Sequence, residues 1–309
     1  MSWIVLSLLT AFSQSLKDVF SKKKLHRIDE YSIAFLMGIF SIIFVFIFLI
    51  LAKNTSMEKI FPDSASVFFI PQFEELSVSF WEALFINGTL NLIATVVYLK
   101  AIKHSELSVT IPMLAFTPVF LIFTSPIILG KSELPNLVSL MGILLVVFGS
   151  YLLNINECHL GFWKPFRALL KENGPRLMLL VAFIWSITSI YDKVGSRETS
   201  SIFWTLSVHF YINIFIGIIL IFRRLKKIET FKISHIKEII PIGLFNSLTS
   251  LFQMTAVQLA LVANIISIKR TSIVISTIFG YLFFREKNIR SRILGASIMV
   301  LGVIFITLS

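Results

Sequence analysis

ANIISIKRTSIVISTIFGYLFFRE, residues 263–286, is apolar and long enough to cross a lipid bilayer, yet it carries two adjacent cations, Lys269 and Arg270. A charge at the centre of a spanning helix costs roughly 2.5–3.5 kcal/mol on insertion scales, and an off-centre charge costs less. In one interpretation the two cations line a polar cavity and bind an anionic substrate. In the other they snorkel to the nearer membrane face or pair with neighbouring carbonyls.

The composition of the whole chain is that of a membrane protein. Hydrophobic residues make up 56% of the 309 residues, and the mean hydropathy is +0.87. Because the apolar runs are continuous rather than alternating, they predict helices and not a barrel. We expect an all-α integral membrane protein with ten transmembrane helices, at about residues 3–20, 31–52, 80–99, 107–129, 136–154, 177–196, 201–222, 239–259, 263–284 and 292–308.

The basic residues predict the orientation of the spans. The odd-numbered connections hold 20 of the 28 Lys and Arg residues, and the even-numbered connections hold 5. The positive-inside rule then puts the odd connections in the cytoplasm and both termini outside. Basic residues in cytoplasmic connections account for the net charge of +11. We therefore expect no nucleic acid as a partner, and the expected partner is the lipid bilayer. The single cysteine, Cys158, excludes an intrachain disulfide and a cysteine metal cluster.

The chain contains an internal repeat. SELPNLVSLMGILLVVFGSYLL (132–153) aligns with REKNIRSRILGASIMVLGVIFI (285–306), which matches Gly142 with Gly295 and Gly149 with Gly302. NGTLNLIATVVYLKAI (87–102) aligns with IGLFNSLTSLFQMTAV (242–257). We therefore expect a first five-helix repeat at residues 1–155, a cytoplasmic linker at 156–176 and a second repeat at 177–309. Five is odd, so the second repeat must enter from the opposite side, which predicts two inverted repeats with a site between them.

These motifs resemble the EamA-type transporters of the drug/metabolite transporter superfamily. The resemblance rests on Pro118 in the fourth span, Gly130 and Glu133 in a short loop, and then Gly142 and Gly149. The tail GYLFFREKNIRSRILGASIMVLGVIF (280–305) is similar to the second EamA unit. The resemblance implies a multi-pass transporter of the bacterial inner membrane. The pair Lys269 and Arg270 also resembles the basic pair of sugar-phosphate and nucleotide-sugar translocators, which implies a phosphate or carboxylate partner.

Several polar residues inside the spans are candidates for the site. The predicted substrate-binding residues are Lys269, Arg270, Asn91, Asn246, Tyr98, Gln253 and Trp185, and the predicted gate residues are Asp18, Lys22, Asp192 and Lys193. Further candidates are Gln14, Tyr191, His209 and Asn213. Asn91 and Asn246 occupy matching places in the repeats, so they are either a pair of substrate-binding amides or interhelical hydrogen-bonding residues. The gate residues are alternatively ordinary charges at helix ends near the headgroups.

The sequence predicts a secondary transporter that moves an amino acid, an organic acid or a phosphorylated compound by alternating access. Export of lipophilic or cationic drugs is an alternative that requires a carboxylate near the midplane, and Asp18, Glu82, Glu106 and Asp192 are all expected near span ends. A membrane scaffold without transport is another. No P-loop, HExxH or Ser/His/Asp cluster appears, so we expect neither an ATP-driven pump nor an enzyme. We expect no cofactor or metal, and either a monomer or a homodimer.

Overall fold

The computed structural model describes residues 2–24, 28–54, 70–104, 110–152, 173–225, 236–284 and 289–308. Every regular element within these ranges is a helix, which confirms the predicted all-α fold. Five helices, α2, α4, α9, α10 and α11, are each long and apolar enough by themselves to cross a membrane. Of the remaining spans, α1 is a single helix of 22 residues with several polar side chains, and the others are shorter apolar helices or consecutive pieces of helix.

Each repeat supplies five spans. The first contains α1 (Trp3–Lys24), α2 (Glu30–Asn54), α4 (Val78–His104), a fourth span made of η3 (Ile111–Phe116) and α6 (Thr117–Leu129), and α7 (Leu137–Leu152). The second contains α9 (Asn173–Glu198), α10 (Ser201–Leu225), α11 (Ile236–Leu259), a ninth span made of α12 (Val262–Lys269) and α13 (Ser272–Phe284), and α14 (Ile289–Thr307). Two single-turn helices, η2 (Phe73–Glu75) and η4 (Lys131–Glu133), lie in the connections.

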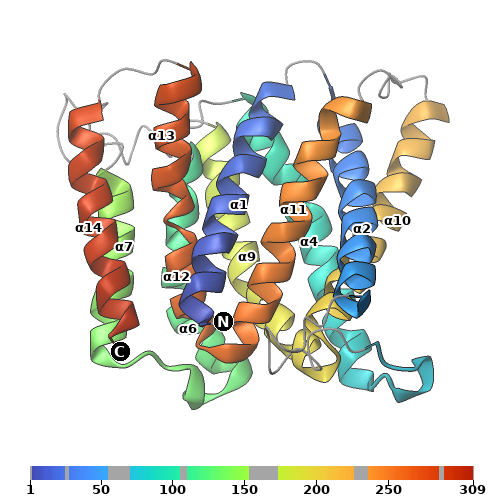
Figure 1. The fold of residues 1–309 in the computed structure, drawn as a ribbon, viewed down its shortest axis with the longest axis horizontal. Helices are drawn as coiled ribbons and strands as arrows, with labels where there is room; N and C mark the ends of the chain where they lie inside the picture. Colours follow the sequence, from blue (N-terminus) through green and yellow to red (C-terminus); the bar gives the residue numbers. More distant parts are fainter. Residues whose placement is uncertain are drawn as a thin grey trace.

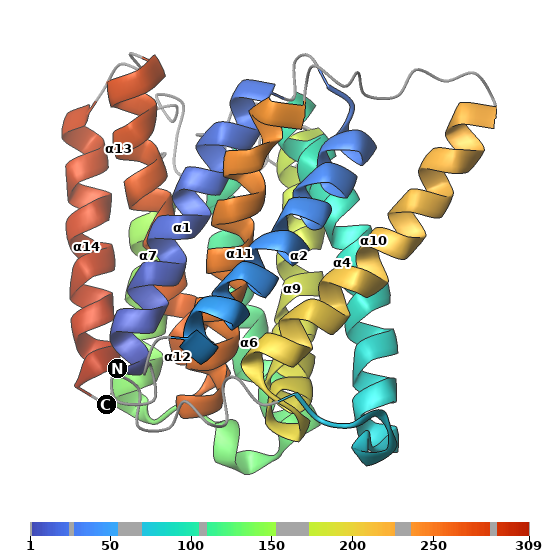
Figure 2. The same cartoon turned by 45° about the vertical axis from the view of Figure 1, so that its right-hand side comes forward.

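The two repeats are inverted. Figure 1 shows α1 running upward and its counterpart α9 running downward, and the same reversal holds for α2 with α10 and for α4 with α11. The two chain ends lie at the same end of the bundle in Figures 1 and 2, as an even number of spans requires. The most extensive helix contacts are α7 with α14, α4 with α9, and α1 with α11. Exchanging the repeats maps the pair of α7 and α14 onto itself and exchanges the other two pairs, so the contacts follow a pseudo-two-fold axis.

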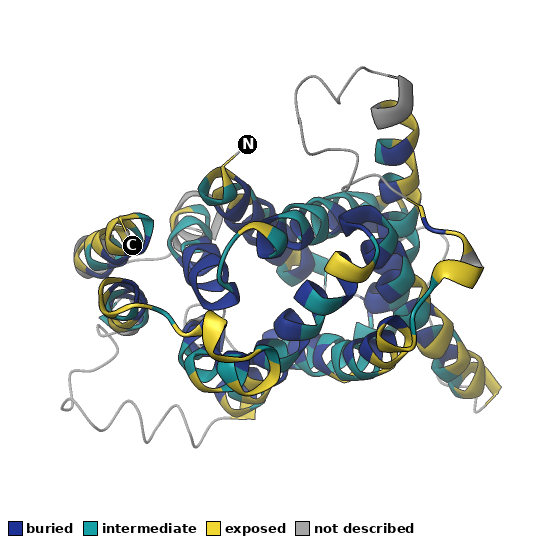
Figure 3. Cartoon of the chain, turned by 90° about the horizontal axis from the view of Figure 1, so that it is seen from below, coloured by how far each residue is buried: buried dark blue, intermediate teal, exposed yellow. Residues whose placement is uncertain are grey.

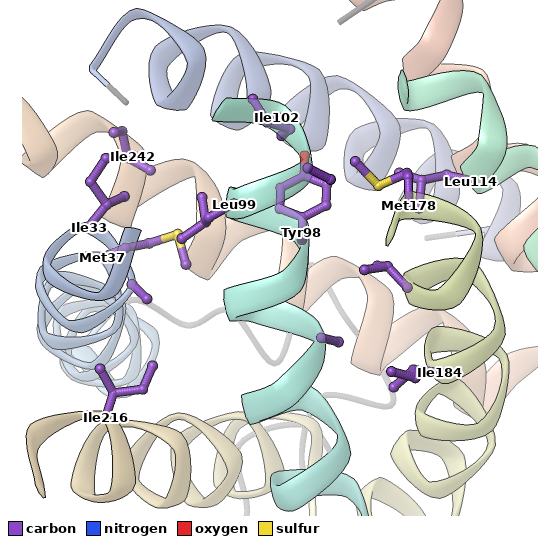
Figure 4. Packing of buried hydrophobic residues seen from close by; sticks show 14 of the residues in the cluster. Ile33, Met37, Tyr98, Leu99, Ile102, Leu114, Met178, Ile184, Ile216 and Ile242 are labelled. Atoms are coloured by element: carbon purple, nitrogen blue, oxygen red, sulfur yellow. The ribbon is translucent and has the colours of Figure 1, made fainter. Parts of the chain in front are cut away.

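Apolar packing holds the two repeats together. Figure 4 shows Ile33 and Met37 of α2, Leu99 of α4 and Ile242 of α11 in one buried cluster. The buried residues of the helices face the inside of the bundle, and the exposed residues face outward (Figure 3). The outward residues are large and apolar, for example Phe85 and Ile127. Apolar side chains on the outer surface are the expected ones for a bundle whose solvent is lipid.

The fourth and ninth spans are not continuous α-helices, although α12 and α13 together cover the predicted ninth span, 263–284. The break in the ninth span lies at Arg270 and Thr271, between α12 and α13. Around it the amides of Thr271 and Ile273 donate to carbonyls three residues back, so the turn is tighter than an α-helix. The fourth span changes from η3 to α6 at Thr117. The repeat offset that matches Gly142 with Gly295 also matches Thr117 with Arg270, so both repeats break at equivalent positions.

Several boundaries differ from the expected ones. Helix α1 extends to Lys24 and α9 begins at Asn173, so both are longer than predicted. The last four residues of the expected linker, 173–176, belong to α9, and residues 156–172 lie outside the described part of the chain. The longer helices place residues that seemed close to span ends further inside the bundle.

The repeated glycines bring α7 and α14 into close contact. A Cβ atom added at Gly142 would lie 2.7 Å from the Gly302 carbonyl oxygen, and one added at Gly149 would lie 2.6 Å from the Gly295 carbonyl oxygen. Each of these glycines therefore lies against the backbone of the opposite helix, which leaves no room for a side chain. The seven-residue spacing repeats this contact two turns further along each helix.

We predict that Gly142→Val lowers the thermal stability of the purified protein in detergent. The new methyl groups would have to displace the α14 backbone, and overpacking of this kind costs about 1–3 kcal/mol. Met141→Val is the matched control, because Met141 is the neighbouring residue on α7 and is 52% exposed. Equal melting temperatures for the two variants would contradict the close packing of α7 against α14.

Candidate functional site

A cavity of about 130 Å³ lies between the two repeats. Its lining comes from α1, α2 and α4 of the first repeat and from α9, α10, α11, α12 and Arg270 of the second. All seven predicted substrate-binding residues contribute to the lining: Asn91, Tyr98, Trp185, Asn246, Gln253, Lys269 and Arg270. Of the further candidates, Gln14, His209 and Asn213 line it as well. Tyr191 instead packs against the apolar cluster around Trp204.

The cations of the cavity gather around two aromatic rings. Lys269 Nζ is 5.7 Å and Arg270 Cζ is 5.9 Å from the centre of the Trp185 ring. Lys17 of α1, which is not among the residues predicted from the sequence, has its Nζ 5.5 Å from the centre of the Tyr98 ring. The Tyr98 and Trp185 rings are themselves 5.2 Å apart. Three cations therefore surround one aromatic pair, and the cation–π attraction offsets part of their desolvation.

Lys269 is connected to a buried carboxylate through one amide. Lys269 Nζ donates to Gln253 Oε1 at 2.5 Å, and Gln253 Nε2 donates to Asp192 Oδ2 at 3.2 Å. Asp192 Oδ1 accepts hydrogen bonds from Asn87 Nδ2 at 2.8 Å and from Trp204 Nε1 at 3.1 Å. Both carboxylate oxygens are thus engaged by protein donors. Gln253 relays the negative charge of Asp192 to Lys269, because its amide donates to one residue and accepts from the other.

Arg270, like Lys269, makes one side-chain hydrogen bond to the protein, although a guanidinium carries more N–H donors than an ammonium. Its side chain is 1% exposed, and Nη2 donates to Thr117 Oγ1 at 3.1 Å. Its Nε atom has no hydrogen-bond partner, and none of the ion pairs among the described residues includes Arg270. A guanidinium has five N–H donors arranged as a fork that matches a carboxylate or a phosphate. Arg270 therefore has donors available for an anion that enters the cavity.

The expectation that Asp18 and Asp192 lie near the headgroups at helix ends is wrong. Asp18 is 1% exposed, and its Oδ1 accepts from the Tyr98 hydroxyl at 2.5 Å and from Gln14 Nε2 at 2.7 Å. Asp192 is 3% exposed and lines the cavity. Both carboxylates sit one and a half turns inside helices that are longer than the sequence indicated. The cations of the site thus have two anions in their immediate surroundings.

The two matching asparagines make different contacts. Asn91 Nδ2 donates to Asn87 Oδ1 within α4 at 2.8 Å. Asn246 Nδ2 lies 3.0 Å from Ser41 Oγ of α2 and 3.1 Å from His209 Nε2 of α10. Asn246 thus joins three helices, whereas Asn91 bonds only within its own, and both line the cavity. The two interpretations given to this pair are compatible, because one amide can hold helices together and still face a ligand.

Lys193 lies in a second polar pocket, at the end of the bundle that carries the chain termini. Its Nζ is 2.5 Å from Glu133 Oε1 and donates to the Ala260 carbonyl at 2.7 Å. Glu133 Oε2 also accepts from the Val262 amide at the start of α12. Lys193 is therefore paired with Glu133, and not with its neighbour Asp192. Lys22, another predicted gate residue, donates to the Ile102 carbonyl at 2.9 Å.

Sequence reasoning missed Lys17, Asn87, Thr117 and Glu133 as parts of these networks. Lys17 had a usable signal, because it is a cation inside the first span. Glu133 stood in a family motif, but its partner Lys193 is 60 residues away in the chain. For Asn87 and Thr117 only the three-dimensional contacts reveal the role.

The chain is similar to a known protein family and to a solved structure. A family model described as the EamA-like transporter family matches residues 1–155 and 173–308. A solved structure, described only as the crystal structure of a protein, has a TM-score of 0.68 and 12% sequence identity, and the alignment covers 99% of this chain and 97% of the other. At that identity the likeness shows the fold alone. A search among curated proteins found no match.

We predict that Asp192→Ala destabilises the protein by roughly 3–5 kcal/mol, the range for breaking a buried charge network. Asn87, Trp204 and Gln253 would lose their acceptor, and Lys269 would lose the nearby anion. Asp192→Asn should cost less, since its carbonyl oxygen still accepts from Asn87 and Trp204. Thermal melting in detergent measures both, with the exposed carboxylate variant Glu82→Ala as control. Similar melting temperatures for Asp192→Ala and Glu82→Ala would refute this account of the network.

Proposed function

The chain belongs to the EamA-like transporter family and is a membrane transporter, and we propose that it moves a small polar or anionic metabolite by alternating access. The observation that carries the substrate class is Arg270, a buried cation in the lining of the central cavity with a free Nε and no carboxylate partner among the described residues. Lys17 and Lys269 add positive charge around it. An amino acid, an organic acid or a phosphorylated compound presents the oxygens that such a site can bind.

The position and the size of the cavity support this proposal. The cavity lies between two inverted repeats, which is the usual place for a transporter site that is exposed to each side in turn. Its volume of about 130 Å³ is below the roughly 300–1,000 Å³ of pockets that hold drug-sized ligands. A small metabolite therefore fits better than a bulky lipophilic drug. A scaffold without transport would leave the burial of Lys269 and Arg270 unexplained.

Export of lipophilic cations remains the second candidate, because Asp18 and Asp192 supply the deep carboxylates that it requires. The hydrogen bonds in the cavity favour an anionic substrate over a cationic one. Both oxygens of Asp192 and one oxygen of Asp18 already accept from protein donors, whereas Arg270 Nε has no acceptor.

The orientation proposed for the chain puts both termini outside the cytoplasm of a bacterial inner membrane. The basis is the excess of Lys and Arg in the odd-numbered connections. The Lys193–Glu133 pair then lies on the outer side. We assign this pair the role of a gate, because Glu133 comes from the first repeat and Lys193 from the second, and their side chains are 6% and 2% exposed. Movement of one repeat against the other would have to separate them.

We predict that Arg270→Gln reduces uptake of the anionic substrate at least about tenfold, since a hydrogen bond to a charged group is worth about 1.5–3 kcal/mol. Lys269→Gln should also reduce uptake, by a smaller factor, because it removes positive charge from the cavity without removing the donors of Arg270. The measurement is counterflow into proteoliposomes with a panel of phosphates, carboxylates, amino acids and nucleotides. Arg224→Gln is the matched control, because it removes one positive charge from an exposed position at the end of α10. Full transport by both cavity variants would remove the proposed site.

We predict that Glu133→Gln combined with Lys193→Met opens the outer side of the cavity. Ser250 lines the central cavity. A cysteine in its place, introduced in a Cys158→Ser background, should then react faster with a membrane-impermeant maleimide added from the side of the termini. The matched control removes a salt bridge within one repeat, Glu30→Gln with Lys103→Met, whose charged atoms are 2.8 Å apart. Unchanged labelling of the first variant, or an equal rise in the control, would count against a gate at Glu133.

A further inference from the structure

The end of the cavity between α2 and α10 differs in chemistry from the end at Arg270. Its lining consists of Ala34, Met37 and Gly38 of α2 and of Val208, His209, Ile212 and Asn213 of α10, none of which carries a fixed charge. The charged lining residues are Lys17, Asp192, Lys269 and Arg270. In Figures 1 and 2 the helices α2 and α10 lie on one side of α11, and α12 and α13 lie on the other. The cavity therefore has a cationic end and a neutral end.

The neutral end contains a buried acceptor without a donor. Asn213 is 7% exposed, and its Oδ1 has no hydrogen-bond partner. Its Nδ2 donates to the His209 carbonyl at 2.9 Å, and since a carbonyl can only accept, this contact fixes which amide atom is the oxygen. Leaving a buried acceptor unpaired costs about 1–3 kcal/mol. A buried atom of this kind in a cavity calls for a ligand that donates to it.

The space that Asn213 occupies depends on a glycine. A Cβ atom added at Gly38 would overlap the Asn213 side-chain amide. The absence of a side chain at Gly38 thus lets the Asn213 amide lie between α2 and α10 and reach the cavity. Its neighbour His209 is already engaged, because Nδ1 lies 2.7 Å from the Thr205 carbonyl and Nε2 lies 3.1 Å from Asn246 Nδ2. The histidine therefore holds its proton on Nδ1 and accepts through Nε2.

We propose that Asn213 determines specificity by accepting a hydrogen bond from a neutral hydroxyl or amide N–H at the far end of the anionic substrate. This inference rests on the proposed function, because it takes the anion at Arg270 as given. The substrate class is then a small anion with a hydrogen-bond donor at the end opposite its charge. A donor that carried a positive charge would find no fixed negative charge among the lining residues of α2 and α10, so the donor group is neutral.

The experiment compares pairs of anions that differ only at the far end. The probes are 4-hydroxybutyrate with pentanoate, and 2-hydroxyethyl phosphate with propyl phosphate, and affinity is measured by concentration-dependent thermal shift of the purified protein. Wild-type protein should bind the hydroxyl member of at least one pair about tenfold more tightly, as expected for one buried hydrogen bond. Asn213→Leu should remove this preference by weakening the hydroxyl member, with the methyl member bound as before. Gly38→Ala should reduce the preference in the same direction, because it displaces Asn213.

A second variant, Asn213→Asp, tests the role of Asn213 independently of whether Asn213→Leu folds. Asn213→Asp keeps the shape and places a negative charge at the neutral end, so it should improve binding of 4-aminobutyrate relative to wild type. Equal binding of both members of each pair by wild-type protein, or a preference that survives in Asn213→Leu, would overturn the role of Asn213 and leave the anion site standing. Undiminished binding of all four probes by Arg270→Gln, or binding of none by wild type, would overturn the proposed function itself.

Discussion

The burial of Lys269 and Arg270 in the middle of a membrane bundle is the constraint around which the site is built. Two desolvated cations at adjacent positions repel each other as well as lose water, so the structure has to supply compensation nearby. The Trp185 ring supplies part of it, because it lies 5.7 Å from Lys269 Nζ and 5.9 Å from Arg270 Cζ. The buried carboxylate of Asp192, which Gln253 links to Lys269, supplies another part.

The inverted repeat explains where the site is, and the differences between the repeats explain its chemistry. Thr117 and Arg270 occupy equivalent positions at the breaks of the fourth and ninth spans, and they meet across the pseudo-two-fold axis in a hydrogen bond of 3.1 Å. Symmetry thus brings the two breaks together. One break presents a small hydroxyl and the other presents a guanidinium. The same fold with threonine on both sides would contain the cavity without the cationic end.

The sequence predicted the arrangement of the transmembrane helices more reliably than the polar contacts between them. Hydropathy and the internal match predicted ten spans in two inverted repeats, because those patterns record which faces meet lipid and which meet protein. The polar contacts depend on a helix's exact length and rotation, which hydropathy hardly records. Asp192 and Lys193 are neighbours in the chain, yet they point about 100° apart on α9. One therefore lines the central cavity and the other the pocket beside Glu133.

The buried carboxylates give the two adjacent cations different tasks. Lys269 is held by Gln253, which in turn binds Asp192, so its charge is compensated within the protein. Arg270 has Thr117 as its hydrogen-bond acceptor and an unpaired Nε. A transporter has to pass through states with and without substrate, and a site made only of uncompensated cations would be too costly in the unloaded state. Dividing the pair into one tethered and one open cation keeps that cost low, and leaves a single strong donor group to recognise the anion.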